Sequence, residues 1–416
     1  MRHRRFILNL ARIGLPALLG GTCAFGAVVV GGDGTQNTEA PAGSTYWNNL
    51  GYSGFGSGVY LGNGWVLTAA HVHGDVSNAF PFTVPKLDNG NDVTFNATPG
   101  AFVRMHSPAG YLSDITVYRL DDSPLLQRMS PIRFGASPQI GTNITMTGSG
   151  YNRLPALHYW RLNDPTNPDR TAWQDVTGLP NQGTAQARGY VIDTSSRTPN
   201  RWGTNVTVGF EGGGATDVYE PKDASGNILG QTRIFGANFD PITNEGQVVN
   251  FDSGGGVFAG NRLGGMNLLK GDYSYPDANN PDNLGQPANT AVFGNASYFV
   301  DVFSYVDQIA SITKLHPGLD GDANLDGVVD NADFQAFYSH LHTGTGWTQG
   351  DFDLDGQVTF SDYQVLQRNW GKSDGVTAPA PTPLPAFTDV PEPGGLVGLG
   401  LGGVAVLARR RRQRSR

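Results

Sequence analysis

From about residue 44 to residue 150 the chain alternates short apolar runs with turns rich in glycine and asparagine. Two of these runs, residues 58–61 and 65–68, are separated by Gly62, Asn63 and Gly64, which is typical of antiparallel strands joined by a tight turn. The pattern predicts one antiparallel barrel in this part, with the two runs as hairpin partners. With 58 glycines and 26 prolines, the whole chain favours turns and strands over long helices.

The pattern changes after residue 150. Residues 160–201 are rich in Asn, Asp, Pro and Thr, and this composition predicts inserted loops. Loops over the rim of a barrel usually shape the substrate cleft, so substrate specificity is expected to reside there.

Two twelve-residue stretches, 322–333 and 351–362, carry oxygen-bearing side chains at positions 1, 3, 5 and 12 and a glycine at position 6. This is the spacing of a calcium-binding loop, in which position 7 supplies a backbone carbonyl. Apolar residues at three- and four-residue spacing follow each loop and predict an amphipathic helix. The sequence therefore predicts two bound calcium ions and no cofactor for catalysis, with plain acidic turns as the alternative. The predicted ligands are Asp322, Asn324, Asp326, Val328, Asp330, Asp333, Asp351, Asp353, Asp355, Gln357, Thr359 and Asp362.

The two ends differ from the rest of the chain. Residues 1–27 combine a basic start, an apolar stretch and small residues, which predicts a secretory signal; a membrane anchor is the alternative. Residues 372–389 are rich in Pro, Ala and Thr and predict an extended linker. Residues 390–412 contain Val-Pro-Glu-Pro, a short apolar glycine-rich stretch and four arginines. The apolar stretch is shorter than the roughly 20 residues that span a bilayer.

Charge and cysteine content exclude some classes of protein. The formal net charge of −8 argues against nucleic acid as a partner, because the basic runs lie only at the two ends. Cys23 is the single cysteine and lies inside the predicted signal, so the exported protein has no disulfide and depends on its core.

Three polar residues stand out among the predicted strands. His71 follows a buried run and two alanines, Asp114 leads an apolar strand, and Ser253 lies in a glycine-rich turn. A serine hydroxyl becomes a nucleophile when a nearby base takes its proton, and a neutral imidazole suits that task near neutral pH. A buried carboxylate then orients the imidazole and stabilises its positive charge. These are the roles predicted for Ser253, His71 and Asp114.

The order His, Asp, Ser resembles the trypsin-like (chymotrypsin-fold) serine peptidase family. The resemblance rests on Thr-Ala-Ala-His at 68–71, Asp-Ile at 114–115, Gly-Ser-Gly at 148–150 and Asp-Ser-Gly-Gly at 252–255, and it spans residues 28–314. It implies an all-β fold of two six-stranded antiparallel β-barrels with a C-terminal helix. It also implies that residues 262–268 are the strand along which the substrate backbone lies.

The same resemblance assigns roles near the serine. The backbone N–H groups of Phe251 and Ser253 would form the oxyanion hole. The family usually has glycine at the position of Phe251, and a Cβ restricts the backbone there, so the sequence leaves open whether this hole is preformed. Gln247, six residues before the serine, would floor the specificity pocket, where an amide does not select Lys or Arg.

Residues 28–32, Val-Val-Val-Gly-Gly, resemble the mature N-terminus of this family. In the family a freed apolar N-terminus turns inward, and its ammonium pairs with the aspartate before the catalytic serine, which is Asp252 here. The alternative is that these residues are simply a first strand.

The two calcium loops with one trailing helix each resemble a dockerin type I domain, which is expected to be a small α-helical, EF-hand-like module over residues 318–371. Dockerins bind cohesin partners through loop positions 10 and 11, often Ser or Thr, but Asn331, Ala332, Phe360 and Ser361 occupy them here. A cohesin-like partner therefore stays an open question, with a calcium-rigidified spacer as the alternative. Removing calcium is expected to loosen residues 318–371 and to leave hydrolysis by a form of the chain that lacks this module largely intact.

Residues 390–412 resemble the PEP-CTERM sorting signal. This resemblance implies processing by an exosortase-type enzyme and export to the extracellular space or the cell surface of a bacterium, with a transient inner-membrane anchor. A permanent weak anchor is the alternative.

Taken together, the sequence predicts an exported serine endopeptidase that acts on protein or peptide substrates. The alternative of another class is a weak or inactive peptidase fold that serves as a calcium-dependent surface-binding or adhesion protein. Phe251 and Lys270, both at positions where the family usually has glycine, favour the alternative. Esterase action would use the same three residues.

Overall fold

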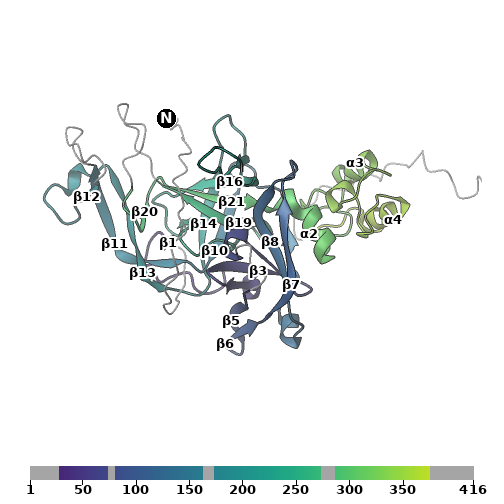
Figure 1. Cartoon of the computed structure of the whole chain (residues 1–416), viewed down its shortest axis with the longest axis horizontal. Helices are drawn as coiled ribbons and strands as arrows, with labels where there is room; N and C mark the ends of the chain where they lie inside the picture. The colour runs from purple at the N-terminus through teal and green to yellow at the C-terminus, as the bar shows by residue number, and fades with distance from the viewer. Residues whose placement is uncertain (1–27, 74–79, 163–172, 273–285, 375–416) are drawn as a thin grey trace, which may run out of the picture.

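The structure is a computed structural model of the chain, and it describes residues 28–73, 80–162, 173–272 and 286–374 (Figure 1). The predicted signal at 1–27, the sorting segment at 390–412 and all but three residues of the predicted linker lie outside the described residues. The described part is mostly β, with two large sheets, a four-stranded sheet toward one end and a pair of helices at the other.

The first large sheet has seven strands in the order β6-β5-β2-β3-β4-β8-β7, and all its pairs are antiparallel. Strands β3 and β4 pair, so the predicted hairpin is confirmed. Seven strands replace the six expected, because the chain turns back at Asn89-Gly90 and adds β6 at the edge. Both residues have positive φ, as tight hairpin turns require. The strands are β2 (Leu50–Ser53), β3 (Gly56–Gly62), β4 (Trp65–Thr68), β5 (Phe82–Asp88), β6 (Asn91–Phe95), β7 (Ala97–His106) and β8 (Leu112–Leu120).

The second large sheet closes on itself. Six strands form an antiparallel ring in the order β14-β10-β18-β19-β21-β16, because β14 also pairs with β16. Strand β15 extends this ring at β16, and the short β9 pairs in parallel with β19. The strands are β9 (Arg133–Phe134), β10 (Asn143–Gly148), β14 (Arg201–Val208), β15 (Asp217–Tyr219), β16 (Thr232–Asn238), β18 (Gly256–Ala259), β19 (Arg262–Gly271) and β21 (Ala296–Asp301).

The expectation of loops over residues 160–201 is wrong for most of the described part. A four-stranded sheet in the order β12-β11-β13-β20 is built largely from this region. Its strands are β11 (Tyr151–Leu162), β12 (Trp173–Asp175), β13 (Ala187–Arg197) and β20 (Thr290–Val292). Pro155 is tolerated in β11 because it lies where the register with β13 shifts, between Arg153 and Leu157, and a bulge does not need its missing N–H.

Residues 28–29 form β1 (Val28–Val29), which pairs with β17 (Gly246–Gln247). In the described chain this segment is therefore a first strand, and the arrangement after N-terminal trimming stays a prediction.

Helices are few and short. They are α1 (Ala70–His73), α2 (Val306–Thr313), α3 (Asn331–Ser339), α4 (Phe360–Asn369) and the 3-10 turns η1 (Trp47–Asn49), η2 (Pro124–Arg128), η3 (Gln182–Thr184), η4 (Val302–Tyr305) and η5 (Trp347–Gln349). Helices α3 and α4 each begin with a capping box, at Asp330 and Thr359 respectively, which satisfies the first backbone N–H groups. Within the described ranges, no helix combines the length and apolar character needed to cross a membrane.

The helical module and the β part share one hydrophobic core. Ile309 of α2 and Trp347 and Phe352 of the module belong to the same buried cluster as strands of both large sheets. The Trp347 indole N–H donates to Asp322 O at 2.7 Å inside this cluster. The two parts are therefore packed as one body, which the sequence did not predict.

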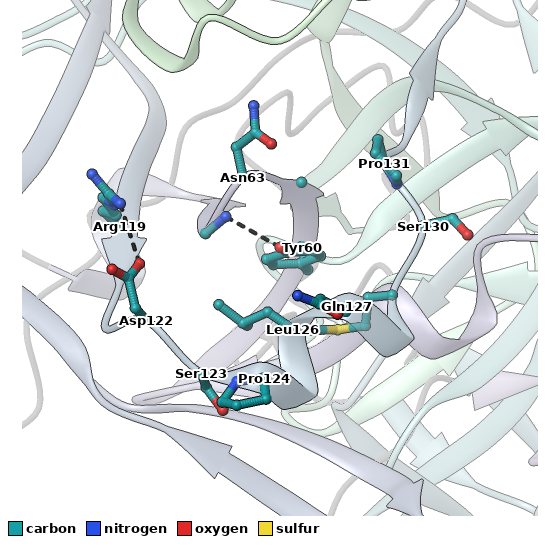
Figure 2. A pocket seen from close by; sticks show the side chains of 13 residues that line it. Tyr60, Asn63, Arg119, Asp122, Ser123, Pro124, Leu126, Gln127, Ser130 and Pro131 are labelled. Atoms are coloured by element: carbon teal, nitrogen blue, oxygen red, sulfur yellow. Dashed lines mark hydrogen bonds and ion pairs between the residues drawn. The ribbon is translucent and has the colours of Figure 1, made fainter.

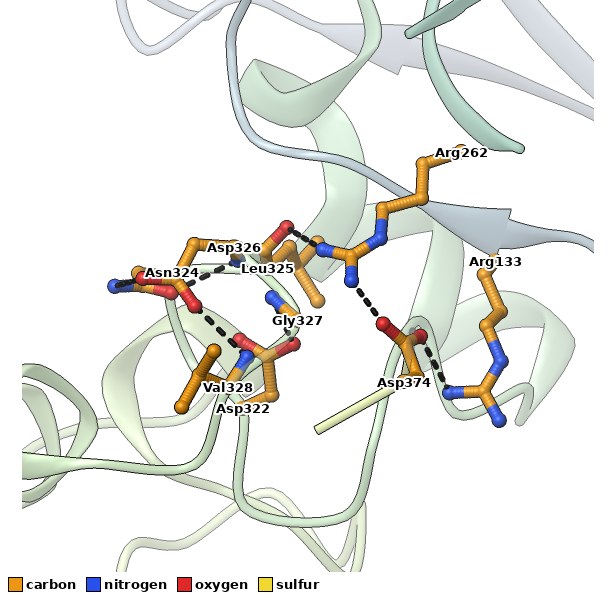
Figure 3. Close-up of polar contacts among 9 residues, drawn as sticks. All are labelled: Arg133, Arg262, Asp322, Asn324, Leu325, Asp326, Gly327, Val328 and Asp374. Atoms are coloured by element: carbon orange, nitrogen blue, oxygen red, sulfur yellow. Dashed lines mark hydrogen bonds and ion pairs between the residues drawn. The ribbon is translucent and has the colours of Figure 1, made fainter. Parts of the chain in front are cut away.

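Polar contacts reinforce this packing at the first calcium loop (Figure 3). Arg262 of β19 donates to Leu325 O at 3.0 Å and pairs with Asp374, which also pairs with Arg133 at 2.9 Å. The predicted linker was expected to begin at Lys372, yet residues 372–374 belong to the folded module, since Lys372 O accepts the Val329 N–H at 2.9 Å.

Candidate active site

The short helix α1 presents His71 at the end of β4, directly after the buried Ala69 and Ala70. Both carboxylate oxygens of Asp114 accept hydrogen bonds from this one residue. The His71 backbone N–H donates to Oδ1 at 2.8 Å, and ring atom Nδ1 lies 2.7 Å from Oδ2. Because a carboxylate can only accept, the proton lies on Nδ1, and in the neutral ring Nε2 is left as the acceptor. This is the tautomer that a general base needs.

Asp114 lies at the start of β8 and is anchored to the second large sheet. Its N–H donates to Thr232 Oγ1 at 2.8 Å, and the neighbouring Ser113 Oγ donates to Gln231 O at 2.6 Å. Strand β16 of the second sheet thereby fixes the carboxylate that orients the histidine, so the pair lies on the seam between the sheets.

Asp114 and His71 shift each other's pKa values in opposite directions. Burial lowers the pKa of His71, but the charge of Asp114 and the hydrogen bond to it outweigh burial, so the pKa is raised above its ordinary value. Burial raises the pKa of Asp114, and His71 outweighs it in the opposite direction, so this pKa is lowered. The His71 side chain is nevertheless 46% exposed, which leaves it accessible to a substrate.

The loop that carries Ser253 is joined to the same seam. The Ser57 N–H of β3 donates to Ser253 O at 2.8 Å. A Cβ at Gly254 would lie 2.3 Å from Thr68 Oγ1, three residues before His71, so only glycine fits there. Ser253 Oγ donates to Leu268 O at 3.2 Å, and among the described residues it has no hydrogen bond to His71. The serine must therefore rotate to meet the base, as is common in proteins without substrate.

Phe251 adopts the backbone conformation that glycine normally provides. Its φ is 74°, in the left-handed region. Among the described residues, the N–H groups of Phe251 and Ser253 donate no hydrogen bond. The two N–H groups lie on either side of Asp252 and are therefore available to the oxyanion predicted from the sequence.

Asp252 is fully buried between two backbone donors. Oδ1 accepts the Gly150 N–H at 2.7 Å and Oδ2 accepts the Val249 N–H at 2.8 Å. A Cβ at Gly148 would lie 2.2 Å from Oδ1, which explains why Gly-Ser-Gly is needed at 148–150. Burial raises the pKa of Asp252 to about 7 against the effect of nearby arginines. The predicted ion pair with a freed N-terminus is untested.

The other two residues singled out near the cleft are held by polar contacts. Gln247 is fully buried in β17, and its amide oxygen accepts from Asn295 at 3.4 Å. Lys270 of β19 donates to Thr290 O at 3.1 Å and pairs with Asp272 at 2.6 Å. The role of Gln247 in specificity stays a prediction.

A hollow of about 870 Å³ lies on the first sheet, between the β3–β4 turn and η2 (Figure 2). Tyr60 forms its floor, and an Arg119–Asp122 ion pair lies at its edge. None of His71, Asp114 and Ser253 lines it, so this hollow is not the catalytic cleft.

The carboxylates of the second predicted calcium loop converge. Ligand atoms of Asp351, Asp353 and Asp355 lie within 4.8 Å of one another, the geometry that a hard cation would bridge. Burial, with the repulsion of neighbouring carboxylates, raises the pKa of Asp351 to about 6. A bound cation would relieve that repulsion.

The first loop also fits a cation. Asp322 Oδ1 is buried and has no partner among the described residues, and burial with repulsion from Asp333 and Asp326 raises its pKa to about 7. At position 12 of each loop, Asp333 and Asp362 accept backbone N–H groups of their own loop. In the first loop, the predicted ligands Asn324 and Asp326 hydrogen-bond each other and so help to shape the loop.

Two residues near the serine loop were missed by the sequence analysis. Ser57 Oγ accepts the Ser149 N–H at 2.9 Å and donates to Phe251 O at 3.1 Å, which links three segments. Arg197 places its guanidinium 4.1 Å from the centre of the Phe251 ring. The available signal was the apolar run Tyr190-Val191-Ile192, which is typical of a strand and is followed by Arg197.

Comparison with known proteins gives a match to one family model. A model of the trypsin family matches residues 29–195, a range that contains His71 and Asp114 and ends before Ser253. Among solved structures, the chain is similar to a mutant of human heparin binding protein (CAP37), with 12% sequence identity and a TM-score of 0.38, over 69% of this chain and 97% of that chain. None of the curated proteins compared with the chain matches it. Residues 29–195 therefore match a trypsin-like serine peptidase domain, and the described residues are mostly β, with two β-sheet subdomains and a few short helices.

Proposed function

We propose that the protein is an exported serine endopeptidase that hydrolyses peptide bonds through His71, Asp114 and Ser253. The observation that supports this most is the double hydrogen bond of Asp114 to His71, which fixes the tautomer of the base. The two unused N–H groups of Phe251 and Ser253 add a binding site for the oxyanion.

In this mechanism Ser253 Oγ attacks the substrate carbonyl carbon while its proton passes to Nε2 of His71. The N–H groups of Phe251 and Ser253 stabilise the oxyanion, and Asp114 stabilises the imidazolium. The C–N bond breaks as His71 returns the proton to the leaving amine, leaving an acyl ester on Ser253. Water then attacks this ester with His71 as base, which releases the acid and regenerates the serine.

Labelling of the exported protein by a fluorophosphonate probe tests the proposal. Wild type should be labelled, whereas Ser253→Ala should not, and His71→Ala should slow labelling by about a thousandfold or more. Hydrolysis of a peptide library then separates an endopeptidase from an esterase. Absence of labelling in a folded wild-type protein would contradict the proposal.

The contact of Ser253 Oγ with Leu268 O favours a second candidate, a weak or inactive peptidase fold that serves as a calcium-dependent surface-binding protein. In that case the probe would not react, and calcium-dependent retention on a bacterial surface would be observed for wild type and Ser253→Ala alike.

We further propose that residues 318–374 bind two calcium ions and that the tail directs export. Carboxylates of both loops would hold the ions, which supply positive charge and rigidity in the module and have no part in hydrolysis. The dockerin-like nature of the module, a cohesin-like partner, processing by an exosortase-type enzyme, a transient inner-membrane anchor and delivery to the bacterial surface rest on the sequence resemblances alone. Mass spectrometry of the exported chain would reveal whether residues 390–412 have been removed.

A further inference from the structure

The oxyanion loop contains a conformation that needs support. Phe251 has φ 74°, and a residue with a Cβ in the left-handed region costs about 1–3 kcal/mol unless its surroundings hold it there. The loop lies between residues 250 and 255, outside any strand or helix, so regular secondary structure does not supply that support.

Three side chains supply the support that the conformation of Phe251 needs. The Arg197 guanidinium lies 4.1 Å from the centre of the Phe251 ring, and the Tyr151 ring meets that ring edge-on at 5.0 Å. Ser57 Oγ donates to Phe251 O at 3.1 Å and so fixes the peptide that follows. Phe251 is thereby held on both its side chain and its backbone.

Arg197 is itself rigidly placed. Only 9% of it is exposed, and its Nε and Nη2 atoms donate to Ser149 O at 3.2 and 2.9 Å. The next residue, Gly150, donates to the buried carboxylate of Asp252. Arg197 therefore acts on the loop before the serine in two ways. It packs directly on Phe251, and it binds the segment 149–150, whose Gly150 N–H binds Asp252.

We propose that Arg197 is a positioning residue for catalysis: by packing on Phe251 it holds the left-handed conformation that aims the oxyanion-binding N–H groups, without a freed N-terminus. This inference rests on the proposed peptidase function.

The surroundings of Asp252 support the second half of this proposal. Two backbone N–H groups bind its oxygens, and the charges of Arg197 and Arg201 act on it from the protein interior. The N-terminal segment is held elsewhere through its carbonyls, with Arg153 Nε donating to Val29 O at 2.8 Å and Arg201 donating to Gly34 O. Both oxygens of Asp252 are therefore bound by backbone N–H groups of the fold, and the N-terminal segment is bound at a different place.

A double-mutant cycle between Arg197 and Phe251 tests the inference. Arg197→Leu removes the cation and should lower kcat by about 100-fold with little change in KM, the size of effect seen when one oxyanion donor is lost. Glycine adopts positive φ without support, so in a Phe251→Gly background, whatever its own activity, Arg197→Leu should lower kcat by about threefold or less. A merely structural role for Arg197 would give the same loss in both backgrounds, and that result would overturn the inference.

Two matched variants sharpen the test. Arg188→Leu changes an exposed arginine on the same strand, 5.8 Å from the Phe293 ring, and should leave kcat within twofold. Arg197→Lys keeps the charge but loses the planar stacking and the paired donors, so its loss should be intermediate.

The two proposals fail in different ways. If neither wild type nor Phe251→Gly reacts with the fluorophosphonate probe, the peptidase function is wrong and the inference falls with it. If Phe251→Gly reacts but wild type does not, the function stands and the inference is overturned, because Arg197 would then hold the loop in an unproductive form. If activity of the exported chain appears only after trimming to Val29, independence from the N-terminus is overturned.

Discussion

Both carboxylate oxygens of Asp114 accept hydrogen bonds from His71, and this contact changes the pKa of the His71 imidazole. The charge and hydrogen bond of Asp114 raise the pKa of the imidazole even though burial opposes them. Protonated imidazole cannot accept the serine proton, so in the proposed mechanism the pKa of His71 would set the acid limit of activity.

The acid limb of the kcat/KM profile should therefore have its midpoint above about 6.5, the ordinary pKa of histidine. Below that midpoint activity falls, because the raised pKa keeps His71 protonated to higher pH. Asp114→Asn removes the charge that raises the pKa and should lower kcat by about ten-thousandfold. A flat profile between about pH 5 and 8 would contradict the role of His71 as the base.

The candidate catalytic residues could be proposed from the sequence, because their motifs are local; the structure brings His71 and Asp114 together, and the catalytic roles stay a prediction. His71, Asp114 and Ser253 each follow a recognisable strand or turn. The conformation of Phe251 could not be predicted, since its φ depends on Arg197 and Tyr151, more than fifty residues earlier in the chain. Contacts of this separation leave no pattern in a single sequence.

At the scale of elements, the end of β10 and the serine loop are fitted to each other. Asp252 fills the space that side chains at 148 and 150 would need, so the glycines there are required by close approach. The strand and the loop therefore have to move together.

Gly148→Ala should destabilise the protein by about 1–3 kcal/mol, because its Cβ would lie 2.2 Å from Asp252 Oδ1 and 2.7 Å from Cγ. Gly183→Ala is the matched control, since a Cβ there has no atom within 4 Å and φ is not in the left-handed region. Chemical denaturation of both variants measures the difference. Equal stability of the two variants would show that Asp252 adjusts freely.

The four-stranded sheet shows where prediction from composition fails. Residues 160–201 contain many turn-forming residues, yet β11 and β13 pair over most of their length. Pro155 is accommodated at a bulge, and strand β20, nearly a hundred residues later, adds a partner to β13. Long-range pairing of this kind outweighs local preference.

At the scale of the whole molecule, the helical module shares one hydrophobic core with the two large sheets. The expectation that a form lacking the module keeps its hydrolysis after calcium removal stays a prediction. In the whole chain, Trp347 and Ile309 lie in one buried cluster with both large sheets. Arg262, at the start of the β19 strand that contains Leu268, donates to Leu325 O in the first predicted calcium loop and also pairs with Asp374.

Trp347→Ala should cost about 3–5 kcal/mol, since the indole is fully buried and its N–H is paired. Thermal unfolding should show the whole chain melting earlier in a single transition. Phe360→Ala is the control, because this aromatic side chain belongs to the same module and is 48% exposed. Loss of the module signal alone would contradict the shared core.

Calcium removal should lower the Tm of the peptidase part together with that of the module. Without the cation, the carboxylates within each loop repel one another. The resulting strain reaches the β part through Arg262 and Trp347. Calorimetry with and without calcium measures this. Asp353→Asn should weaken the response to calcium, and two separate transitions with an unchanged peptidase transition would contradict the coupling.

The shared core also limits how this protein can be recombined. Domains that are connected only by a flexible linker can be exchanged by cutting that linker. In this protein, a cut near residues 315–317 would divide one apolar cluster and expose both halves to solvent. A fusion that moves residues 318–374 onto another enzyme would carry an uncovered apolar face, and a peptidase left behind would carry its counterpart. The β part and the helical module therefore have to be expressed and engineered as a single unit.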